Sequence, residues 1–214
     1  MKEQELLTLL KKMHPQAECE LNFSTPYQLL VAVILSAQCT DKRVNMVTEG
    51  MFKRYPTPQS ILALSQDELE QEIKSCGFYH NKAKNILAAT KMLMEEYDGV
   101  VPEDRDLLER LPGVGRKTAN VVYAVAFGGN AIPVDTHVFR LSHRLGLSGQ
   151  NTPNGVERDL TARFPEEDWS HLHHLLIHHG RYVCKAISPR CEECLLTNLC
   201  TYYQNKNGEG NAQK

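Results

Sequence analysis

Apolar positions recur at helical spacing along most of the chain. The segment 27–38, YQLLVAVILSAQ, is apolar on nearly every side, and Thr25-Pro26-Tyr27-Gln28 at its start is a capping box with proline in the first helical position. Ser65-Gln66-Asp67-Glu68 is a second capping box and predicts a helix toward Lys74. The N-terminal segment, MKEQELLTLLKKMHP, predicts a short amphipathic helix. We expect further helices at about 82–97, 104–110, 116–127, 136–145, 156–164 and 169–183.

The sequence carries no sign of β-hairpins. No Asn-Gly or Asp-Gly pair lies between two alternating apolar runs. Asp98-Gly99 and Gly128-Gly129-Asn130 instead follow predicted helices, where glycine is typical of a helix end. The pattern therefore predicts an all-α fold, and only the tail NKNGEGNAQK, residues 205–214, has the composition of a disordered segment.

Composition adds limits on partners and location. The chain has 214 residues, 42% of them hydrophobic, and a formal net charge of −2, so any contact with nucleic acid must come from a local basic patch. The longest apolar run, Leu29–Leu35, is too short to cross a bilayer, and the N-terminus lacks the apolar core of a signal peptide. We expect a cytoplasmic protein with no membrane partner.

Four of the seven cysteines are crowded near the C-terminus. Their spacing is C-x6-C-x2-C-x5-C, and they are Cys184, Cys191, Cys194 and Cys200. Thiolates are soft ligands, and four of them suit either zinc or an iron–sulfur cluster. We predict one metal centre on these four residues, with an iron–sulfur cluster favoured. The other three, Cys19, Cys39 and Cys76, are expected to be small buried side chains.

The loop between the first two of these cysteines is basic. With Arg181 just before it, the window 181–190 carries three positive charges, Arg181, Lys185 and Arg190, and no acidic residue. A solvated surface loop would have the same composition. The alternative is a loop that contacts phosphates and is braced by the metal centre.

Two glycines join two of the predicted helices. In the segment 111–118, LPGVGRKT, Pro112 ends one helix, and Gly113 and Gly115 permit a positive φ and a close backbone approach. The next helix begins at once, so its free N–H groups point into the turn and can bind a phosphate, directly or through a cation on the carbonyls. A simple helix connector remains the alternative.

Lys117, directly after this turn, is a candidate nucleophile. Lysine amines form Schiff bases, but an unperturbed lysine is neutral in roughly one molecule in 2,500 at pH 7. Asp135, in the segment VDTH, is the nearest candidate proton acceptor, although its position also fits a helix N-cap. Because a nearby carboxylate raises the pKa of an ammonium, Asp135 would help by accepting a proton and by stabilising positive charge during the reaction.

Taken together, these segments resemble the endonuclease III family of DNA repair enzymes. The resemblance runs from about residue 20 to residue 200, and its motifs in this order are highly specific. They are LSAQCTD at 35–41, GFYHNKAKNI at 77–86, VPEDRDLLERLPGVGRKTANVV at 101–122, VDTHVFR at 134–140, HHGRYVC at 178–184 and the cysteine spacing.

The resemblance implies two helical domains with a DNA-binding cleft between them. One, residues 20–130, is a six-helix barrel with the helix-hairpin-helix. The other, residues 1–19 with 131–206, holds a 4Fe-4S cluster on the four cysteines, and residues 207–214 form a flexible tail. A cluster with four thiolates is negatively charged, so we expect Arg181, Lys185 and Arg190 to offset its charge beside DNA.

The resemblance also implies a reaction. An oxidised pyrimidine, of the thymine glycol type, is flipped out of duplex DNA. Lys117 attacks the sugar C1′ and expels the base, a Schiff base forms, and β-elimination cleaves the strand on the 3′ side. Asp135 takes the place of the family's aspartate. The enzyme is expected to be a monomer associated with the bacterial nucleoid.

Residues of three segments are implied to contact the DNA. Gln38 enters the space left by the flipped base, and the loop that carries Phe78, Tyr79 and His80 is the wedge on the opposite strand. The hairpin holds a phosphate through its backbone, with a monovalent cation as a further ligand, and the basic loop contributes more contacts. The residues concerned are Gly113, Val114, Gly115, Arg116, Lys185 and Arg190. Phe78 stands where many members have leucine, and Cys39 where many have alanine.

Two other functions share parts of this pattern. A monofunctional adenine DNA glycosylase would share the hairpin and the cluster, but relatives of that type lack the lysine found here at Lys117 and carry a longer C-terminal domain. A non-catalytic DNA-binding or redox protein would need neither Lys117 nor Asp135. Both residues therefore favour the glycosylase and AP lyase.

Overall fold

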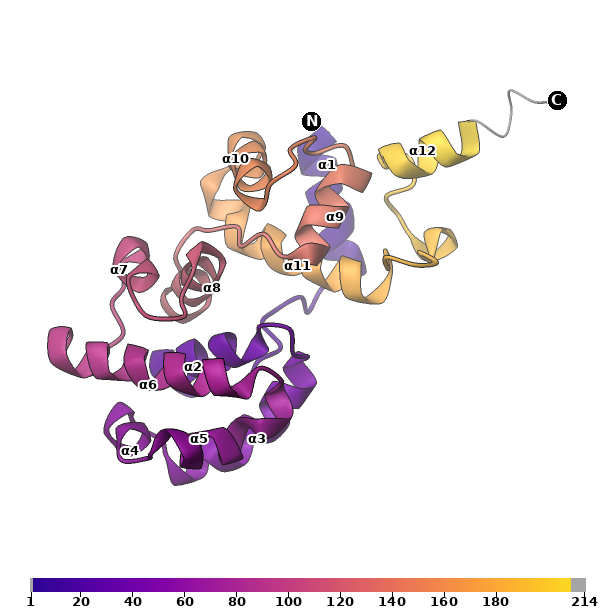
Figure 1. The fold of residues 1–214 in the computed structure, drawn as a ribbon. Helices are drawn as coiled ribbons and strands as arrows, with labels where there is room; N and C mark the ends of the chain where they lie inside the picture. The colour runs from indigo at the N-terminus through magenta and orange to yellow at the C-terminus, as the bar shows by residue number, and fades with distance from the viewer. Residues whose placement is uncertain (1, 209–214) are drawn as a thin grey trace. The chain divides into compact units, whose positions relative to one another are not determined.

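The computed structural model describes residues 2–208 as helices joined by turns and loops, with no strand in that range (Figure 1). The prediction of an all-α fold is confirmed. The chain forms two compact units, which meet in sequence at Cys19/Glu20 and at Gly129/Asn130. We call Glu20–Gly129 the middle unit, and the chain up to Cys19 together with the part from Asn130 onward the terminal unit.

The middle unit contains seven α-helices and one 3-10 helix. They are α2 (Pro26–Ser36), α3 (Asp41–Arg54), α4 (Pro58–Leu62), α5 (Gln66–Ile73), η1 (Lys74–Cys76), α6 (Tyr79–Glu96), α7 (Arg105–Glu109) and α8 (Arg116–Phe127). The helix α2 lies at the centre of this unit, and every one of its residues from Tyr27 to Leu35 is buried. A helix that is apolar all round has to be surrounded, and α3, α6 and α8 pack against it.

The terminal unit is built around α11. Its helices are α1 (Lys2–Met13), α9 (Thr136–Arg144), α10 (Pro153–Arg163), η2 (Glu166–Asp168), α11 (Trp169–Tyr182), η3 (Cys191–Glu193) and α12 (Thr201–Gly208). Both α9 and α1 pack on α11, and their apolar stripes form one hydrophobic core. Among the described residues, no helix is both long enough and apolar enough to cross a membrane.

One of the two predicted capping boxes is confirmed in full, and the other only in its first half. At α5 the Ser65 hydroxyl accepts from the Glu68 N–H at 3.3 Å, and Glu68 accepts from the Ser65 N–H at 2.8 Å, so the reciprocal box is confirmed. At α2, Thr25 accepts from the Gln28 N–H at 3.2 Å, but Gln28 accepts from the Ser24 N–H at 2.9 Å. The second half of that predicted box is therefore wrong, because the glutamine reaches one residue further back.

Some helices were missed or mispositioned. The sequence did not predict α3, because only Val44, Thr48 and Met51 face the core and the rest of this helix is polar. It placed the start of α6 at residue 82, three residues too late, since the first turn of α6 carries polar side chains.

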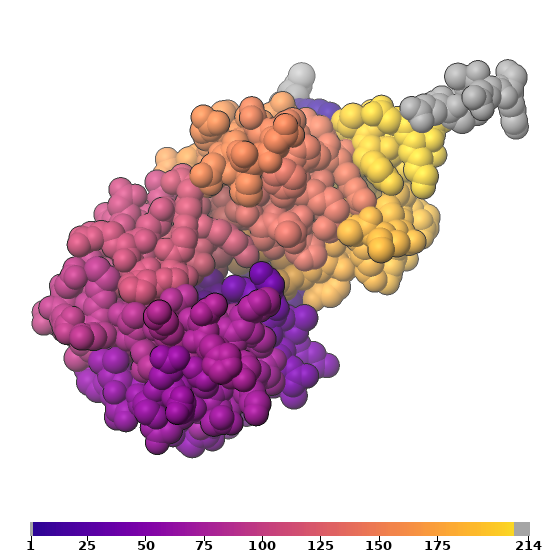
Figure 2. Space-filling model, viewed as in Figure 1, coloured from indigo at the N-terminus to yellow at the C-terminus, as the bar shows by residue number. Residues whose placement is uncertain are grey.

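The polar tail is shorter than predicted. Because α12 extends to Gly208, the predicted disorder is wrong for 205–208, and the predicted tail boundary at 207 falls inside this helix. Figure 2 shows α12, in yellow, against the cysteine-rich segment, where Tyr202 and Tyr203 line the same pocket as the cysteines. This packing stabilises a helix that its composition does not favour. Residues 209–214 of the predicted tail lie outside the described residues.

Candidate functional site

The glycine segment forms a tight hairpin between α7 and α8 within the middle unit. Leu111 and Val114 are buried in the unit core, with exposed fractions of 2% and 5%, and the Val114 N–H donates to the Leu111 carbonyl at 3.0 Å. Two buried anchors around the turn leave its glycines at the surface. The side chain of Val114 is therefore occupied by packing, and only its backbone is available to a ligand.

The two hairpin glycines are required for different reasons. Gly113 has φ +78°, and a Cβ there would lie 2.6 Å from the Cβ of Asn85, so both conformation and space demand glycine. Gly115 has φ −93°, so the positive φ that both glycines permit is adopted only by Gly113 of the two. A Cβ at Gly115 would meet nothing within 4 Å. As the N-cap of α8, Gly115 supplies no side-chain bond, so the first N–H groups of that helix lack a side-chain cap.

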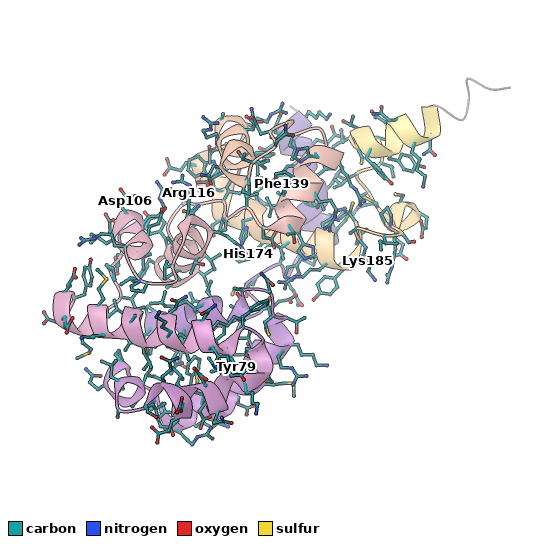
Figure 3. The ribbon with its side chains drawn as sticks, viewed as in Figure 1. Tyr79, Asp106, Arg116, Phe139, His174 and Lys185 are labelled. Atoms are coloured by element: carbon teal, nitrogen blue, oxygen red, sulfur yellow. The ribbon has the colours of Figure 1, made fainter. Side chains whose placement is uncertain are left out.

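The first turn of α8 carries two basic residues. Arg116 lies close to α7, where its guanidinium is 3.8 Å from a carboxylate oxygen of Glu109 (Figure 3). Lys117 is exposed, and within the middle unit no ion pair holds its amine. Lys117 is thus set beside the uncapped helix start without a carboxylate of its own unit to stabilise the ammonium form.

Asp135 lies in the terminal unit as the N-cap of α9. Its Oδ1 accepts from the backbone N–H groups of His137 and Val138, each at 2.8 Å. The predicted N-cap role is therefore present. These two bonds fix the orientation of the carboxylate and use only one of its two oxygens, which leaves Oδ2 available for another partner.

Two short segments of the middle unit hold strained residues. Gln38, after α2, has φ +53°, and Phe78, the N-cap of α6, has φ +49°. Such angles cost a non-glycine residue roughly 1–2 kcal/mol, so the surrounding fold must impose them. Phe78 is 66% exposed although it is large and apolar. Exposed, strained residues of this kind are typical of ligand-binding positions.

Tyr79 and His80 follow Phe78 in the first turn of α6, not in a loop as predicted. Their rings lie 4.1 Å apart between centroids, and His80 Nδ1 is 2.6 Å from a carboxylate oxygen of the buried Glu70. Figure 3 shows Tyr79 at this end of the helix. The Glu70 contact anchors His80, while most of its ring stays exposed.

A buried lysine that the sequence analysis missed holds both strained segments. Lys82 is 5% exposed, and its amine donates to the carbonyls of Leu35 at 2.8 Å and of Cys76 at 2.6 Å. These carbonyls belong to the end of α2, before Gln38, and to the end of η1, before Phe78. Burial lowers the pKa of Lys82. The sequence did contain a signal for this buried lysine, because Lys82 lies four residues before Ile86 and so on the apolar face of the helix.

The four clustered cysteines line one pocket of the terminal unit. Its other walls include Leu141 of α9 and Leu145 directly after that helix, His179 of α11, and Tyr202 and Tyr203 of α12. In residues 2–208, no group of three or more His, Cys, Asp or Glu side chains has the arrangement of a site for a single metal ion. All four cysteines for which one metal centre is predicted therefore line the same pocket, and their binding of a metal stays a prediction.

The thiols of this pocket fit a positively charged centre. Burial raises the pKa of Cys194 to about 11, and the negative charges of the neighbouring cysteines raise it further. Burial likewise raises the pKa of Cys200. Free thiols would therefore stay protonated at neutral pH, and metal ions would offset the cost of bringing four thiolates together.

An arginine outside the predicted set contacts the cluster segment. Arg144, the last residue of α9, donates to the Cys184 sulfur at 3.3 Å and to the carbonyls of Lys185 at 2.7 Å and Ala186 at 3.0 Å. Its guanidinium also lies 4.6 Å from the centre of the Tyr202 ring. Arg144 thus joins α9, the basic loop and α12, and it places positive charge beside a cysteine.

The basic loop itself is arranged differently from expectation. Lys185 is exposed on the loop that follows α11 (Figure 3). Arg190 pairs with Glu193, with a nitrogen–oxygen distance of 3.3 Å, because η3 turns an acidic side chain back toward it. Arg144, which is not among the expected Arg181, Lys185 and Arg190, also brings a positive charge against a cysteine sulfur.

Histidines connect the pocket to α1. The Cys194 sulfur is 3.5 Å from Nε2 of His179, whose Nδ1 is 3.0 Å from Nε2 of His14. Burial lowers the pKa of His179 to about 4, and the neighbouring His14 lowers it further, so this ring is neutral at physiological pH. Two histidines of α11, His173 and His179, are buried, with exposed fractions of 2% and 1%.

Family comparisons match most of the chain. The model of the HhH-GPD superfamily base excision DNA repair protein matches residues 31–166, and that of the iron-sulfur binding domain of endonuclease III matches residues 184–200. Endonuclease III of Bacillus subtilis (strain 168) is 56% identical over 199 residues, which are 92% of this chain and 91% of that protein. Endonuclease III of Escherichia coli (strain K12) is 46% identical over 198 residues, 92% and 94% of the two chains.

Solved structures agree with the sequence comparisons. A trapped endonuclease III–DNA covalent intermediate, described as an estranged-adenine complex, superposes with a TM-score of 0.92 at 50% identity and covers 97% of this chain and 99% of its own. A thermostable thymine-DNA glycosylase has a TM-score of 0.84 at 24% identity, covering 95% and 97%, which shows a shared fold.

Alanine substitution should separate the roles of the hairpin glycines. Gly113→Ala is expected to lower the free energy of unfolding by about 2 kcal/mol or more, from the left-handed backbone and the contact with Asn85. Gly115→Ala should cost less than about 1 kcal/mol, because only a weaker N-cap results. Urea unfolding of the two variants, followed by circular dichroism, measures both. Equal losses would contradict the assigned conformations.

Proposed function

Because this chain belongs to the endonuclease III family of base excision repair enzymes, we propose that it removes oxidised pyrimidines, of the thymine glycol type, from duplex DNA through a Schiff base on Lys117. The observation that carries the proposal is the place of Lys117. It lies exposed in the first turn of α8, directly after the hairpin, in a chain that is 56% identical to an endonuclease III.

The class of activity follows from family membership. The chain is a DNA glycosylase and AP lyase of base excision repair, it binds DNA, and it contains a 4Fe-4S cluster. A monofunctional adenine glycosylase and a non-catalytic redox protein are therefore not required as alternatives. The ranking toward oxidised pyrimidines, a monomeric state and a location at the nucleoid remain parts of the proposal.

In the proposed reaction Lys117 acts as the nucleophile. Its neutral amine attacks C1′ of the damaged nucleotide, the bond between C1′ and the base breaks, and the base leaves with a proton. The C1′–O4′ bond then breaks, O4′ takes up a proton, and the amine nitrogen forms a double bond to C1′. This ring-opened Schiff base makes the C2′ proton acidic. Loss of that proton expels the 3′ phosphate oxygen and cleaves the strand. Lys117 needs to lose a proton before the first step, and the exposed position of the amine lets it exchange protons readily.

We assign the proton-accepting and charge-stabilising role to Asp135. Its Oδ1 is held by two backbone N–H groups at the start of α9, so the carboxylate is oriented before substrate binds. Oδ2, which those bonds leave available, is the oxygen to which we assign the proton. The N-cap bonds therefore support catalysis, because they restrict the carboxylate to one orientation.

Three segments are proposed to hold the DNA. Gln38 enters the gap left by the flipped base, and Phe78, with Tyr79 and His80 beside it, wedges into the opposite strand. The hairpin binds a phosphate through the backbone of Gly113, Val114, Gly115 and Arg116, with a monovalent cation as a predicted further ligand. Lys185 and Arg190 contact phosphates from the basic loop. The strained angles at Gln38 and Phe78 and the uncapped start of α8 support these roles.

We propose that the ligands of the cluster are Cys184, Cys191, Cys194 and Cys200. All four line one pocket, and the family model for the iron–sulfur domain begins at the first and ends at the last. Bound to a cluster, these four thiolates would cross-link the C-terminal segment. The Arg144 side chain would hold the same segment to α9 and offset part of the negative charge.

Borohydride trapping tests the nucleophile. The parent enzyme should form a covalent adduct with duplex DNA that contains thymine glycol, and Lys117→Ala should reduce the adduct to background, because no amine remains to form the reducible imine. Lys91→Ala, an exposed lysine on α6, is the matched control and should trap normally. An adduct that persists in Lys117→Ala would disprove the assignment.

Asp135→Asn separates catalysis from capping. Asparagine is an equally good N-cap, so thermal stability should stay close to that of the parent, while the rate of base removal should fall by about 100-fold or more. Asp135→Ala should lose both activity and stability. Single-turnover base release and thermal unfolding give the two readings. Full activity in the stable Asp135→Asn variant would overturn the assigned role.

Arg144 is predicted to retain the cluster. Arg144→Ala should release iron about tenfold faster in the presence of a chelator, since residues that support metal ligands typically have effects of this size. Arg144→Lys should be intermediate, because it keeps the charge and loses the forked hydrogen bonds. Arg158→Ala, an exposed position on α10, serves as the control. Unchanged iron release in Arg144→Ala would contradict the role inferred from its contacts.

A further inference from the structure

The last turn of α11 carries a buried histidine that contacts the cysteine segment twice. The ring of His179, which is 1% exposed, has its Nε2 atom 3.5 Å from the Cys194 sulfur. Sulfur is larger than oxygen, so this distance allows a hydrogen bond. The backbone carbonyl of His179 accepts from the N–H groups of Val183 at 3.0 Å and of Cys184 at 2.7 Å. His179 therefore binds two of the four proposed ligand residues, one through its side chain and one through its backbone.

The other nitrogen of this ring also has a partner. Nδ1 of His179 lies 3.0 Å from Nε2 of His14, and the two rings meet edge to face with their centroids 5.3 Å apart. His14 directly follows α1, and its N–H donates to the Leu10 carbonyl at 2.9 Å, which continues the last turn of that helix. A residue from the start of the chain is thus connected, through one ring, to a proposed ligand near its end.

Two further contacts hold the end of α1 and the residues after it in this place. The Leu195 N–H donates to the Met13 sulfur at 3.4 Å, and Nε2 of His178 lies 3.1 Å from the Glu18 carbonyl oxygen. Both contacts lie beside the histidine pair, since Met13 precedes His14 and His178 precedes His179. The position of the His14 ring is therefore set by several contacts of the terminal unit.

The direction of the hydrogen bonds in this row follows from the sulfur. A cysteine sulfur bound to a metal is a thiolate, which accepts a hydrogen bond and cannot donate one. The proton of the neutral His179 ring must then lie on Nε2, facing Cys194, and Nδ1 becomes an acceptor. His14 fills that acceptor with its own Nε2–H. The tautomer of His179 that serves the sulfur is thus the one that His14 stabilises.

The Cys194 sulfur also accepts a backbone hydrogen bond. The Leu196 N–H donates to it at 3.4 Å, so two N–H groups converge on this one sulfur. Partners of this kind orient metal ligands and tune the metal they hold. In an iron–sulfur cluster, hydrogen bonds to the sulfurs offset negative charge, and they therefore stabilise the reduced state more than the oxidised state.

We propose that His179 is a positioning residue for the iron–sulfur cluster, that it donates Nε2–H to the Cys194 sulfur, and that His14 holds it in the required tautomer. The hydrogen bond orients Cys194 as a ligand and raises the reduction potential of the cluster. The inference rests on the proposed function only through the assignment of Cys194 as a ligand, and it does not depend on the reaction of Lys117. It gives the end of α1 a role in setting the properties of the cluster.

Voltammetry of the full-length, cluster-containing protein, without DNA, tests the inference. His179→Leu keeps an apolar side chain in the buried position and removes the donor. The equilibrium constant for adding one electron to the cluster should then fall about tenfold, which lowers the reduction potential by ~59 mV. His179→Gln should recover most of the parent potential, because its amide N–H can donate to the same sulfur. His14→Ala should give an intermediate potential, since His179 stays but its tautomer is no longer held.

A matched control and an iron assay complete the experiment. His173 is a second buried histidine of α11 and is not among the residues that line the cysteine pocket, so His173→Leu should keep the parent potential. Iron content is measured on every sample, so that each potential refers to protein that holds a cluster. If His179→Leu takes up no cluster, His14→Ala decides, because it leaves the donor in place. A parent potential in the loaded variants of both histidines overturns the inference, and an equal fall in His179→Leu and His179→Gln overturns the hydrogen bond.

Cys194→Ala separates this inference from the proposed set of ligands. We expect this variant to lose iron, because one of four thiolates is removed. If it keeps the iron content of the parent, the assignment of Cys194 as a ligand fails, and the inference fails with it. If it loses iron while His179→Leu and His14→Ala keep the parent potential, the ligand set stands and the inference alone fails.

Discussion

Unpaired backbone groups at helix ends are the constraint on which this protein depends. A helix leaves its first N–H groups and last carbonyls without internal partners, and these must bind side chains, solvent or a ligand. Here the residues proposed for function lie at such ends. Lys117 is in the first turn of α8, Asp135 caps α9, Gln38 follows α2, and Phe78 caps α6.

The protein satisfies its helix ends in different ways, and the differences correspond to function. Asp135 binds two N–H groups at the start of α9, so the cap and the oriented carboxylate are one feature. The start of α8 has no side-chain cap, since Gly115 has no side chain, and its N–H groups stay available. A capped end provides a positioned acid group, whereas an uncapped end provides a place for an anion.

Buried or partly buried cations hold the functional segments. Lys82 binds two carbonyls at the ends of α2 and η1, and so fixes the chain before Gln38 and before Phe78. Arg144 binds two carbonyls and a cysteine sulfur after α11. In both cases one cation donates to several acceptors, because a charge removed from water is stable only when hydrogen bonds replace those it made to water.

The sequence by itself determined the helical class, the second capping box, the cysteine cluster and the hairpin before Lys117. These features depend on residues within a few positions of one another, where spacing and side-chain chemistry decide the outcome. Only the tertiary structure showed that Lys82 joins two segments, that Arg144 contacts Cys184, and that Glu193 pairs with Arg190. Those partners are brought together by the packing of α3, α6, α9 and α12, which no local pattern specifies. The same reason explains why α12 forms at all: its stability comes from Tyr202 and Tyr203 against the cysteine pocket, not from its own polar sequence.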